Sequence, residues 1–352
     1  MSKLYIHIGF HKTGSTSLQY ALQHSTEELL LSGVRFVSGN VSGNSSDFVT
    51  INAHGSRVQA TVSKAFFEML EVGLGGNAII SAEHLSLIED VQEIRKLERY
   101  VKRYYDEVVI VAYVRRQDKL SISFKQQAAK QAHRGASPSS LLCGHDHTKP
   151  LPDLHWTLLN YLQFYKKYQL WSEVFGASNV FFRVYDRAFL EEGCICKDFS
   201  FLLGMKYGMK SFSVNEGFGV VKTYLKHYLI EKKAPELLAR LVNGVSIDNA
   251  DFELREQFLD SSSFMEPFIA GNKKLPLNDF QIASLTRWDS IAYRIPVEKP
   301  GILLTQLLTR HEPRVTEIMK NFLSFIKIND PDSFSHRSAT KISSSSALPG
   351  RQ

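Results

Sequence analysis

Cysteine is scarce in this chain of 352 residues, and long apolar runs are missing from it. Its cysteines, Cys143, Cys194 and Cys196, are an odd and sparse set that does not make a disulfide framework, which indicates a reducing compartment. No stretch approaches the ~18 uninterrupted apolar residues that cross a bilayer. The N-terminus carries neither the apolar core nor the cleavage site of a secretory signal. We therefore expect a cytoplasmic protein without a membrane span.

The excess of positive charge over negative charge is also slight. Lysine and arginine number 42 against 36 for aspartate and glutamate, a formal net charge of +6, and hydrophobic residues make up 43%. This balance is that of a globular protein, and it excludes a wholly disordered or fibrous chain. A basic stripe with interleaved aromatic residues, the pattern of nucleic-acid-binding surfaces, is absent. We expect a pocket for a small anionic ligand and no nucleic-acid partner.

Short apolar runs alternate with helical periodicity over the first two-thirds of the chain. Residues 4–8 form an apolar run that leads through a glycine loop into helical periodicity at 15–31. Residues 108–114 are all apolar, as in a strand buried on both faces of a parallel sheet. We predict an α/β fold with a mostly parallel central sheet flanked by helices. Further strands are expected at 34–37, 78–80 and 180–185, helices at 58–70, 90–104, 118–131, 155–175 and 186–203, and loops at 38–46 and 135–153.

The loop at residues 9–17 joins the first strand to the first helix, where backbone N–H groups and a helix N-terminus converge on an anion. A nucleoside-triphosphate P-loop needs a lysine directly after its second glycine. Here Gly14 is followed by Ser15, and Lys12 lies two positions before the glycine. The loop therefore has the features of an anion-binding site without the lysine position of an ATPase or GTPase.

Residues 7–19 resemble the 5′-phosphosulfate-binding loop of the sulfotransferases, which use 3′-phosphoadenosine-5′-phosphosulfate (PAPS). The family pattern, Lys-Thr-Gly-Ser/Thr-Thr and an apolar residue, is matched by residues 12–18. In the family the lysine also assists the departure of the bridging oxygen, so the resemblance implies a catalytic role for Lys12. The cofactor-binding residues that it implies are Lys12, Thr13, Gly14, Ser15, Thr16 and Ser17. His11, inside the same loop, is counted with the cofactor-binding residues and is a candidate for contact with the sulfate or the acceptor.

A second element resembles the family at the end of the buried strand. Arg115 ends that strand and Ser123 follows eight residues later, within the next helix, which is the pattern by which sulfotransferases bind the 3′-phosphate of the cofactor. A guanidinium offers two parallel hydrogen bonds to a phosphate. Gln126 shares a helix face with Ser123 and is a candidate substrate-binding residue. The resemblance covers about residues 3–204 and implies PAPS as cofactor, PAP as product and no metal.

Candidates for the general base follow the strand at 78–80. Glu83 and His84 lie at its carboxyl end. Similar sulfotransferases carry their base here or nearby, a histidine in cytosolic small-molecule enzymes and a glutamate in several carbohydrate-modifying ones. We favour Glu83, with His84 as the alternative, because adjacent side chains diverge and one of them faces the sulfuryl group. His54 is a further candidate for contact with the acceptor. His145 and His147 lack an evident third ligand and predict no metal site.

The resemblance implies a P-loop NTPase-like sulfotransferase fold with a helical C-terminal part. We expect one domain over residues 1–332, with a cofactor-binding core at about 3–204, a helical acceptor-side part without clear strands at about 205–332, and a disordered tail at 333–352. Helices of the acceptor-side part are expected at 220–230, 234–241, 279–291 and 315–326.

The expected activity is transfer of the sulfuryl group from PAPS to a hydroxyl or amine of a small-molecule, carbohydrate or glycolipid acceptor. Peripheral contact with a membrane stays open. Two alternatives remain at this point: a P-loop-type nucleotide kinase or NTPase, and a non-catalytic protein that binds anions or nucleic acid.

Overall fold

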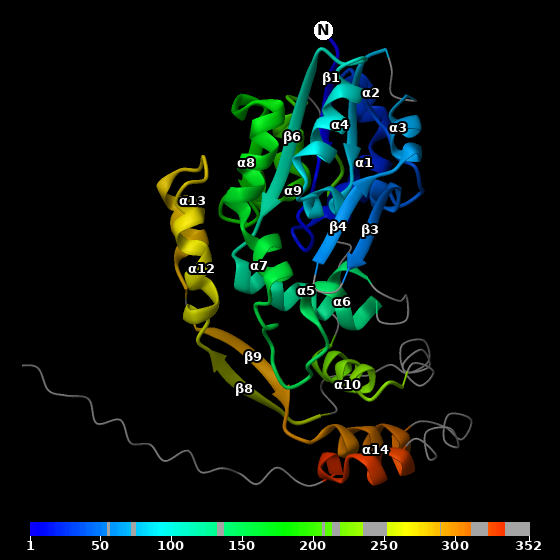
Figure 1. The fold of residues 1–352 in the computed structure, drawn as a ribbon, viewed down its shortest axis with the longest axis vertical. Coiled ribbons are helices and arrows are strands. Elements are labelled where there is room, and N and C mark those ends of the chain that lie inside the picture. Colours follow the sequence, from blue (N-terminus) through cyan, green and yellow to red (C-terminus); the bar gives the residue numbers. More distant parts are fainter. Residues whose placement is uncertain are drawn as a thin grey trace, which may run out of the picture. The chain divides into compact units, whose positions relative to one another are not determined.

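The computed structural model of the protein divides into two compact units, one of Met1–Phe218 with Phe258–Ala292, the other of Gly219–Gln257 with Tyr293–Gln352 (Figure 1). The expected single domain, with its inner boundary near residue 204, stays a prediction. The structure describes residues 1–54, 57–71, 75–131, 137–205, 208–212, 219–234, 252–288, 290–310 and 323–334. The predicted tail, from residue 335 onward, lies outside this described part.

A five-stranded parallel sheet forms the centre of the first unit (Figure 1). Its order is β2-β5-β1-β6-β7, so β1 lies in the middle. Leu4 of β1 pairs with Ala78 of β5 on one side and with Val108 of β6 on the other. The predicted α/β fold with a mostly parallel sheet is thereby confirmed. The strands are β1 (Lys3–His7), β2 (Val34–Phe36), β5 (Asn77–Ser81), β6 (Glu107–Val114) and β7 (Val180–Val184).

Helices cover both faces of this sheet because alternate strand residues point to opposite sides. Val109 and Val111 belong to the core on one side, and Val108 and Ile110 to the core on the other. The first side is packed by α1 (Ser15–His24), α2 (Thr26–Leu31) and α9 (Ile195–Leu202). The second side is packed by α4 (Val91–Val101), α5 (Gln117–Gln131), α7 (Trp156–Leu162) and α8 (Phe164–Phe175).

The helix predicted at 58–70 is wrong over its first part. Residues Val49–His54 and Arg57–Val62 form an antiparallel pair of strands, β3 and β4, and the helix α3 starts at Lys64 and ends at Glu71. Val58, Ala60 and Val62 are buried at alternate positions, which is the period of a strand. The loop predicted at 38–46 is confirmed over residues 38–44, and a short 3₁₀ helix, η1 (Ser45–Phe48), follows it.

Four predicted elements differ in part from the structure. The helix predicted at 15–31 is broken at Ser25, and that at 155–175 is broken at Gln163, where the backbone leaves helical angles. Within the segment 186–203 the α-helix is confined to α9, and the predicted loop 135–153 contains the helix α6 (Pro138–Cys143). Local periodicity shows none of these breaks, because the apolar spacing continues across each of them.

The expectation that no strands follow residue 204 is wrong. Strands β8 (Leu254–Leu259) and β9 (Ile291–Pro296) form a two-stranded sheet, so residue 291 starts a strand instead of ending a helix. The remaining helices are α10 (Val220–Glu231), α12 (Ser262–Asn272), α13 (Asp279–Thr286) and α14 (Pro300–Arg310). Of the other helices predicted here, residues 235–241 and 315–322 lie outside the described part. Among the described helices, none combines the length and the apolar character that crossing a membrane requires.

A buried ion pair ties β7 to α9 beneath the carboxyl end of the sheet. The guanidinium of Arg183 donates to both carboxylate oxygens of Asp198, over 2.6 Å from Nε and 2.5 Å from Nη2. The Tyr113 hydroxyl of β6 donates to the same carboxylate over 2.7 Å. The backbone N–H of Glu191 donates to Oδ1 over 3.2 Å, and because Asp198 is fully buried its charge depends on these three partners.

We expect Asp198→Ala to lower the free energy of unfolding by about 1–3 kcal/mol, because the half-buried guanidinium of Arg183 and the buried hydroxyl of Tyr113 lose their acceptor. Urea denaturation measures the change. Lys64→Ala is the control, since the Lys64–Glu68 pair is exposed and its loss should leave stability unchanged. A loss in Asp198→Ala no larger than that of the control would contradict the assignment.

Candidate functional site

The glycine loop leaves β1 along the neighbouring strand β6. Tyr113 donates its N–H to the carbonyl of Gly9 over 2.7 Å, and Phe10 donates its N–H to the carbonyl of Tyr113 over 3.0 Å. The backbone then takes positive φ angles, 62° at Lys12 and 81° at Gly14, before α1 begins at Ser15. The predicted loop therefore lies at the carboxyl end of the sheet, where open α/β folds bind their ligands.

Gly14 is required by its backbone angle and by its packing. Its φ of 81° is strained for other residues, and a Cβ there would lie 2.6 Å from Cε2 of Tyr185. Tyr185 follows β7 and donates its N–H to the carbonyl of Val114 over 2.7 Å. The tight turn before α1 is thus packed against the end of β7.

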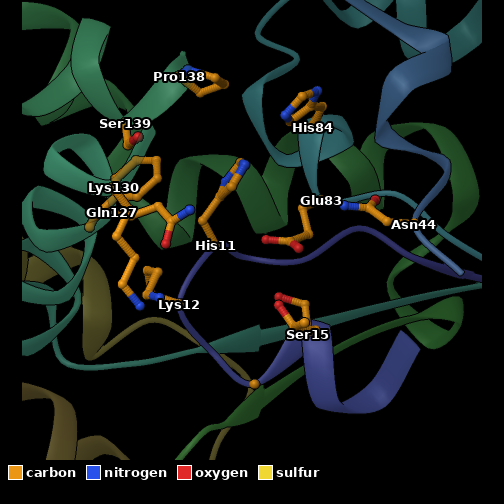
Figure 2. Close-up of a pocket in the computed structure, with 13 residues that line it drawn as sticks. His11, Lys12, Ser15, Asn44, Glu83, His84, Gln127, Lys130, Pro138 and Ser139 are labelled. Atoms are coloured by element: carbon orange, nitrogen blue, oxygen red, sulfur yellow. The ribbon is translucent and has the colours of Figure 1, made fainter. Parts of the chain in front are cut away.

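Two cavities flank the loop. The first, which we name the loop cavity, has a volume of about 370 Å³. It is lined by His11, Lys12, Gly14, Ser15, Thr16, Asn44, Glu83, His84, Phe124, Gln127, Lys130, Pro138 and Ser139 (Figure 2). The second, which we name the arginine cavity, has a volume of about 490 Å³, and its lining includes Ser17, Arg115, Lys119, Tyr185, Arg187 and Cys194. Neighbouring residues of the loop therefore face two separate spaces.

Cations gather where these cavities approach one another. Burial lowers the pKa of the Lys12 ammonium first, and the charges of Lys130 and Arg115 lower it further. Glu83 opposes them by raising that pKa. Neither Lys12 nor Arg115 takes part in the hydrogen bonds and ion pairs found among the described residues. Partly buried like charges repel one another, so this arrangement favours an anionic ligand.

Lys130 and Gln127 are site residues that the sequence analysis missed. Both line the loop cavity from α5. Gln127 lies four positions after Ser123 and Lys130 lies seven positions after it, which is the spacing of one helix face. This spacing could have identified both residues from the sequence. Ser123 and Gln126, the predicted residues on that helix, are half-buried and line neither cavity. Their predicted roles remain untested.

Glu83 comes directly after β5 and begins the 3₁₀ helix η2 (Glu83–Leu87). Its side chain is buried, and burial raises the pKa of its carboxyl group to about 7. Hydrogen bonds from Ser15 and Gln19 and the charge of Lys12 act in the opposite direction. Gln19 also donates to the hydroxyl of Ser81 over 3.0 Å, which fixes its amide beside the carboxylate. Glu83 thus has the pKa of a general base that works near neutral pH.

His84 is held in a different way. Its backbone N–H donates to Oγ of Ser46 over 3.1 Å, and its Nδ1 lies 3.1 Å from the carbonyl oxygen of Ser46. Backbone hydrogen bonds to Ser46 and Val49 raise its pKa, but burial has the larger effect and lowers it. In Figure 2 the two neighbouring side chains diverge, with Glu83 between His11 and Ser15 and His84 directed away. This geometry favours Glu83 over His84 as the base.

The remaining predicted residues take several positions. Thr13 is fully buried and lines neither cavity, since its hydroxyl donates to the carbonyl of Phe10 over 2.6 Å. His11 lines the loop cavity and bonds to Tyr161. His54 is the last residue of β3, and its side chain lies outside the described part.

Arg116, next to Arg115, has a structural position. It is buried, and its Nε lies 2.8 Å from Oδ1 of Asp118. It also donates from Nη1 to the carbonyl of Arg287 over 3.0 Å. Both arginines that follow β6 line the arginine cavity, but Arg116 is bonded to Asp118, so Arg115 is the better candidate for an anionic ligand.

The sequence matches no protein family model and no curated protein. Among solved structures, the chain is similar to the crystal structure of a sulfotransferase from Alicyclobacillus acidocaldarius, with a TM-score of 0.37 and 12% sequence identity. The similarity covers 69% of this chain and 96% of that chain. A likeness this distant assigns neither a substrate nor a site residue.

The raised pKa of Glu83 predicts a pH dependence of stability. Because the folded-state pKa of about 7 exceeds the ordinary value of 4.5, the folded protein binds more protons than the unfolded chain between these pH values. Stability from this group is therefore fully present below pH 4.5 and is lost as the pH rises toward 7. The loss is about 3 kcal/mol, from 1.36 kcal/mol per pKa unit.

Urea denaturation at a series of pH values measures this effect. The amide of Glu83→Gln does not titrate, so we expect its unfolding free energy to lack the fall that Glu83 causes between pH 4.5 and about 7. The difference in unfolding free energy between this variant and the wild-type protein should therefore change over that pH range. Parallel stability curves for the two proteins would show that the carboxyl pKa is not raised.

Proposed function

We propose that this protein is a sulfotransferase that moves the sulfuryl group of PAPS to a hydroxyl or amine of an acceptor. One observation carries the proposal: at the start of α1 the partly buried Lys12 interacts with two further cations, Lys130 and Arg115, and with the buried carboxyl group of Glu83, whose pKa is about 7. The cations suit an anionic donor, and the carboxylate suits a base. The resemblance of residues 7–19 to the family's phosphosulfate-binding loop supports the same assignment.

The two cavities suit a donor with two anionic ends. Lys12, Lys130 and the N-terminus of α1 would hold the 5′-phosphosulfate in the loop cavity. Arg115, with Lys119 and Arg187, would hold the 3′-phosphate in the arginine cavity. Ser17 lines the second cavity while Gly14 to Thr16 line the first, so the loop borders both.

The chain's own residues would act in a single in-line step. PAPS supplies an activated sulfuryl group, and the rest of the chemistry is positioning and charge stabilisation. Glu83 would take the proton of the acceptor hydroxyl as its oxygen forms the new bond to sulfur. Lys12 would stabilise the electron pair that remains on the bridging phosphate oxygen when the old S–O bond breaks. Lys130 would stabilise the charge on the sulfuryl oxygens.

Binding of PAP tests the donor site. We expect adenosine 3′,5′-bisphosphate to stabilise the protein in a thermal-shift titration without Mg²⁺. Lys12→Ala and Arg115→Ala should each weaken binding about ten- to a hundredfold, since each removes a charged hydrogen bond worth ~1.5–3 kcal/mol. Lys64→Ala, an exposed lysine on α3, is the control and should bind PAP as the wild-type protein does. A response to Mg·ATP alone would instead identify a nucleotide kinase or NTPase.

Transfer of ³⁵S from labelled PAPS tests the base. Small polar and sugar acceptors are screened with the wild-type protein, and release of labelled sulfate to water is counted as well. We expect Glu83→Gln to lower turnover by about 10²–10⁴-fold, the usual effect of losing a general base, with unchanged binding of PAP. His84→Gln should retain most of the activity. The opposite ranking of the two variants would make His84 the base.

A further inference from the structure

His11 is held by one hydroxyl at two points. Its backbone N–H donates to the Tyr161 oxygen over 3.2 Å, and its Nδ1 lies 2.8 Å from the same oxygen. The phenol oxygen accepts the backbone N–H, and its own hydrogen can be donated to Nδ1 or to the Ser86 side chain, which also bonds to Tyr161. A neutral imidazole that accepts at Nδ1 carries its proton on Nε2. When Tyr161, which α7 supplies, donates to Nδ1, it fixes the tautomer that presents an N–H at Nε2.

The other ring nitrogen has no partner. The side chain of His11 is only 8% exposed, and its Nε2 is a buried atom without a hydrogen bond among the described residues. A buried polar atom without a partner destabilises the fold, so such atoms usually have a water or ligand partner. Phe124 stacks on the ring at a centroid distance of 5.0 Å, and the ring of His84 lies 5.5 Å away. These contacts hold the imidazole rigidly at the wall of the loop cavity.

The direction of the ring separates it from the donor site. In Figure 2 the His11 ring points toward Pro138 and His84, whereas Lys12 extends the other way, and both His11 and Glu83 line the loop cavity. Lys12, the next residue, interacts electrostatically with Lys130 and Arg115. Burial lowers the pKa of His11 well below its ordinary value, and the charges of His84 and Lys12 lower it further, so the ring stays neutral. It can therefore donate a hydrogen bond without adding a positive charge to the cluster.

We infer that His11 is a catalytic residue on the acceptor side, whose Nε2–H donates to the acceptor oxygen that Glu83 deprotonates. This inference rests on the proposed function. It departs from a role in binding the cofactor, and it makes Tyr161 a positioning residue that acts through the imidazole. The acceptor oxygen then has its hydrogen on Glu83, one lone pair on His11 and the other lone pair free to attack sulfur.

Water serves as the test acceptor, because it needs the same contacts and requires no knowledge of the natural substrate. In this reaction the water oxygen forms a bond to sulfur, and the S–O bond to the bridging oxygen breaks. The electron pair stays on the phosphate oxygen of PAP, and the proton passes to Glu83. The products are PAP and hydrogen sulfate, which loses its remaining proton to the solvent, so release of ³⁵S-sulfate from labelled PAPS measures the step.

Two amide variants separate the roles of the two ring nitrogens. In His11→Gln the amide can reach the position of Nε2, whereas in His11→Asn it reaches only the position of Nδ1. We expect His11→Asn to lower sulfate release by about 10²-fold, the usual loss for one donor in an active site. His11→Gln should restore most of that loss. Both variants should bind PAP with the Kd of the wild-type protein, measured by calorimetry.

Several results would overturn the inference. Activity that survives in His11→Asn and is lost in His11→Gln would show that the ring serves only to bond Tyr161. A weaker affinity for PAP in both variants would place His11 on the cofactor. A wild-type protein that neither binds PAP nor releases sulfate would remove the proposed function itself, which is a different failure.

A measurement on the unmutated protein keeps the inference testable if the variants fold poorly. Spectra of ¹⁵N-histidine-labelled protein distinguish the two neutral tautomers of each imidazole. The His11 signal is the imidazole signal that shifts in Tyr161→Phe. We expect this imidazole to carry its proton on Nε2. A proton on Nδ1 would contradict the donor role.

Discussion

The parallel pairing of β1 with β5 and β6 is the constraint on which the candidate site depends. Because the three strands run in the same direction and in register, the glycine loop, Glu83 and Arg115 emerge at one edge of the sheet. The approach is close: a Cβ on Gly9 would lie 3.4 Å from the Cα of Glu83. Sequence positions that are about 70 and 100 residues apart thereby share one site.

Burial of charge gives that edge its chemical character. Lys12, Lys130 and Arg115 would repel one another less in water, and Glu83 would be ionised well below neutral pH there. Burial lowers the pKa of Lys12 and raises the pKa of the Glu83 carboxyl group to about 7. The same desolvation therefore favours both an anionic ligand and a proton acceptor. The buried pairs Arg183–Asp198 and Arg116–Asp118 show the alternative arrangement, in which each cation has its own carboxylate and serves the fold.

Much of the central sheet could be predicted from local pattern, because a buried parallel strand such as β6 is a continuous apolar run. The strands outside that sheet could not. Buried and more exposed residues alternate along β4, as in a strand, but the segment is short and adjoins the helix α3. Strands β8 and β9 pair across more than 30 residues of chain, and a pairing of that kind leaves no local periodicity.

The sequence by itself predicted where a candidate anion site lies, since the order strand, glycine loop, helix brings backbone N–H groups together whatever else the chain does. It also placed Glu83 and His84 at a strand end, but not their directions. Only the tertiary structure decided that Glu83 meets Ser15 and Lys12, that His84 meets the backbone at Ser46, and that Tyr161 holds His11. The physical reason is that each choice depends on partners distant in sequence, whose positions are set by packing.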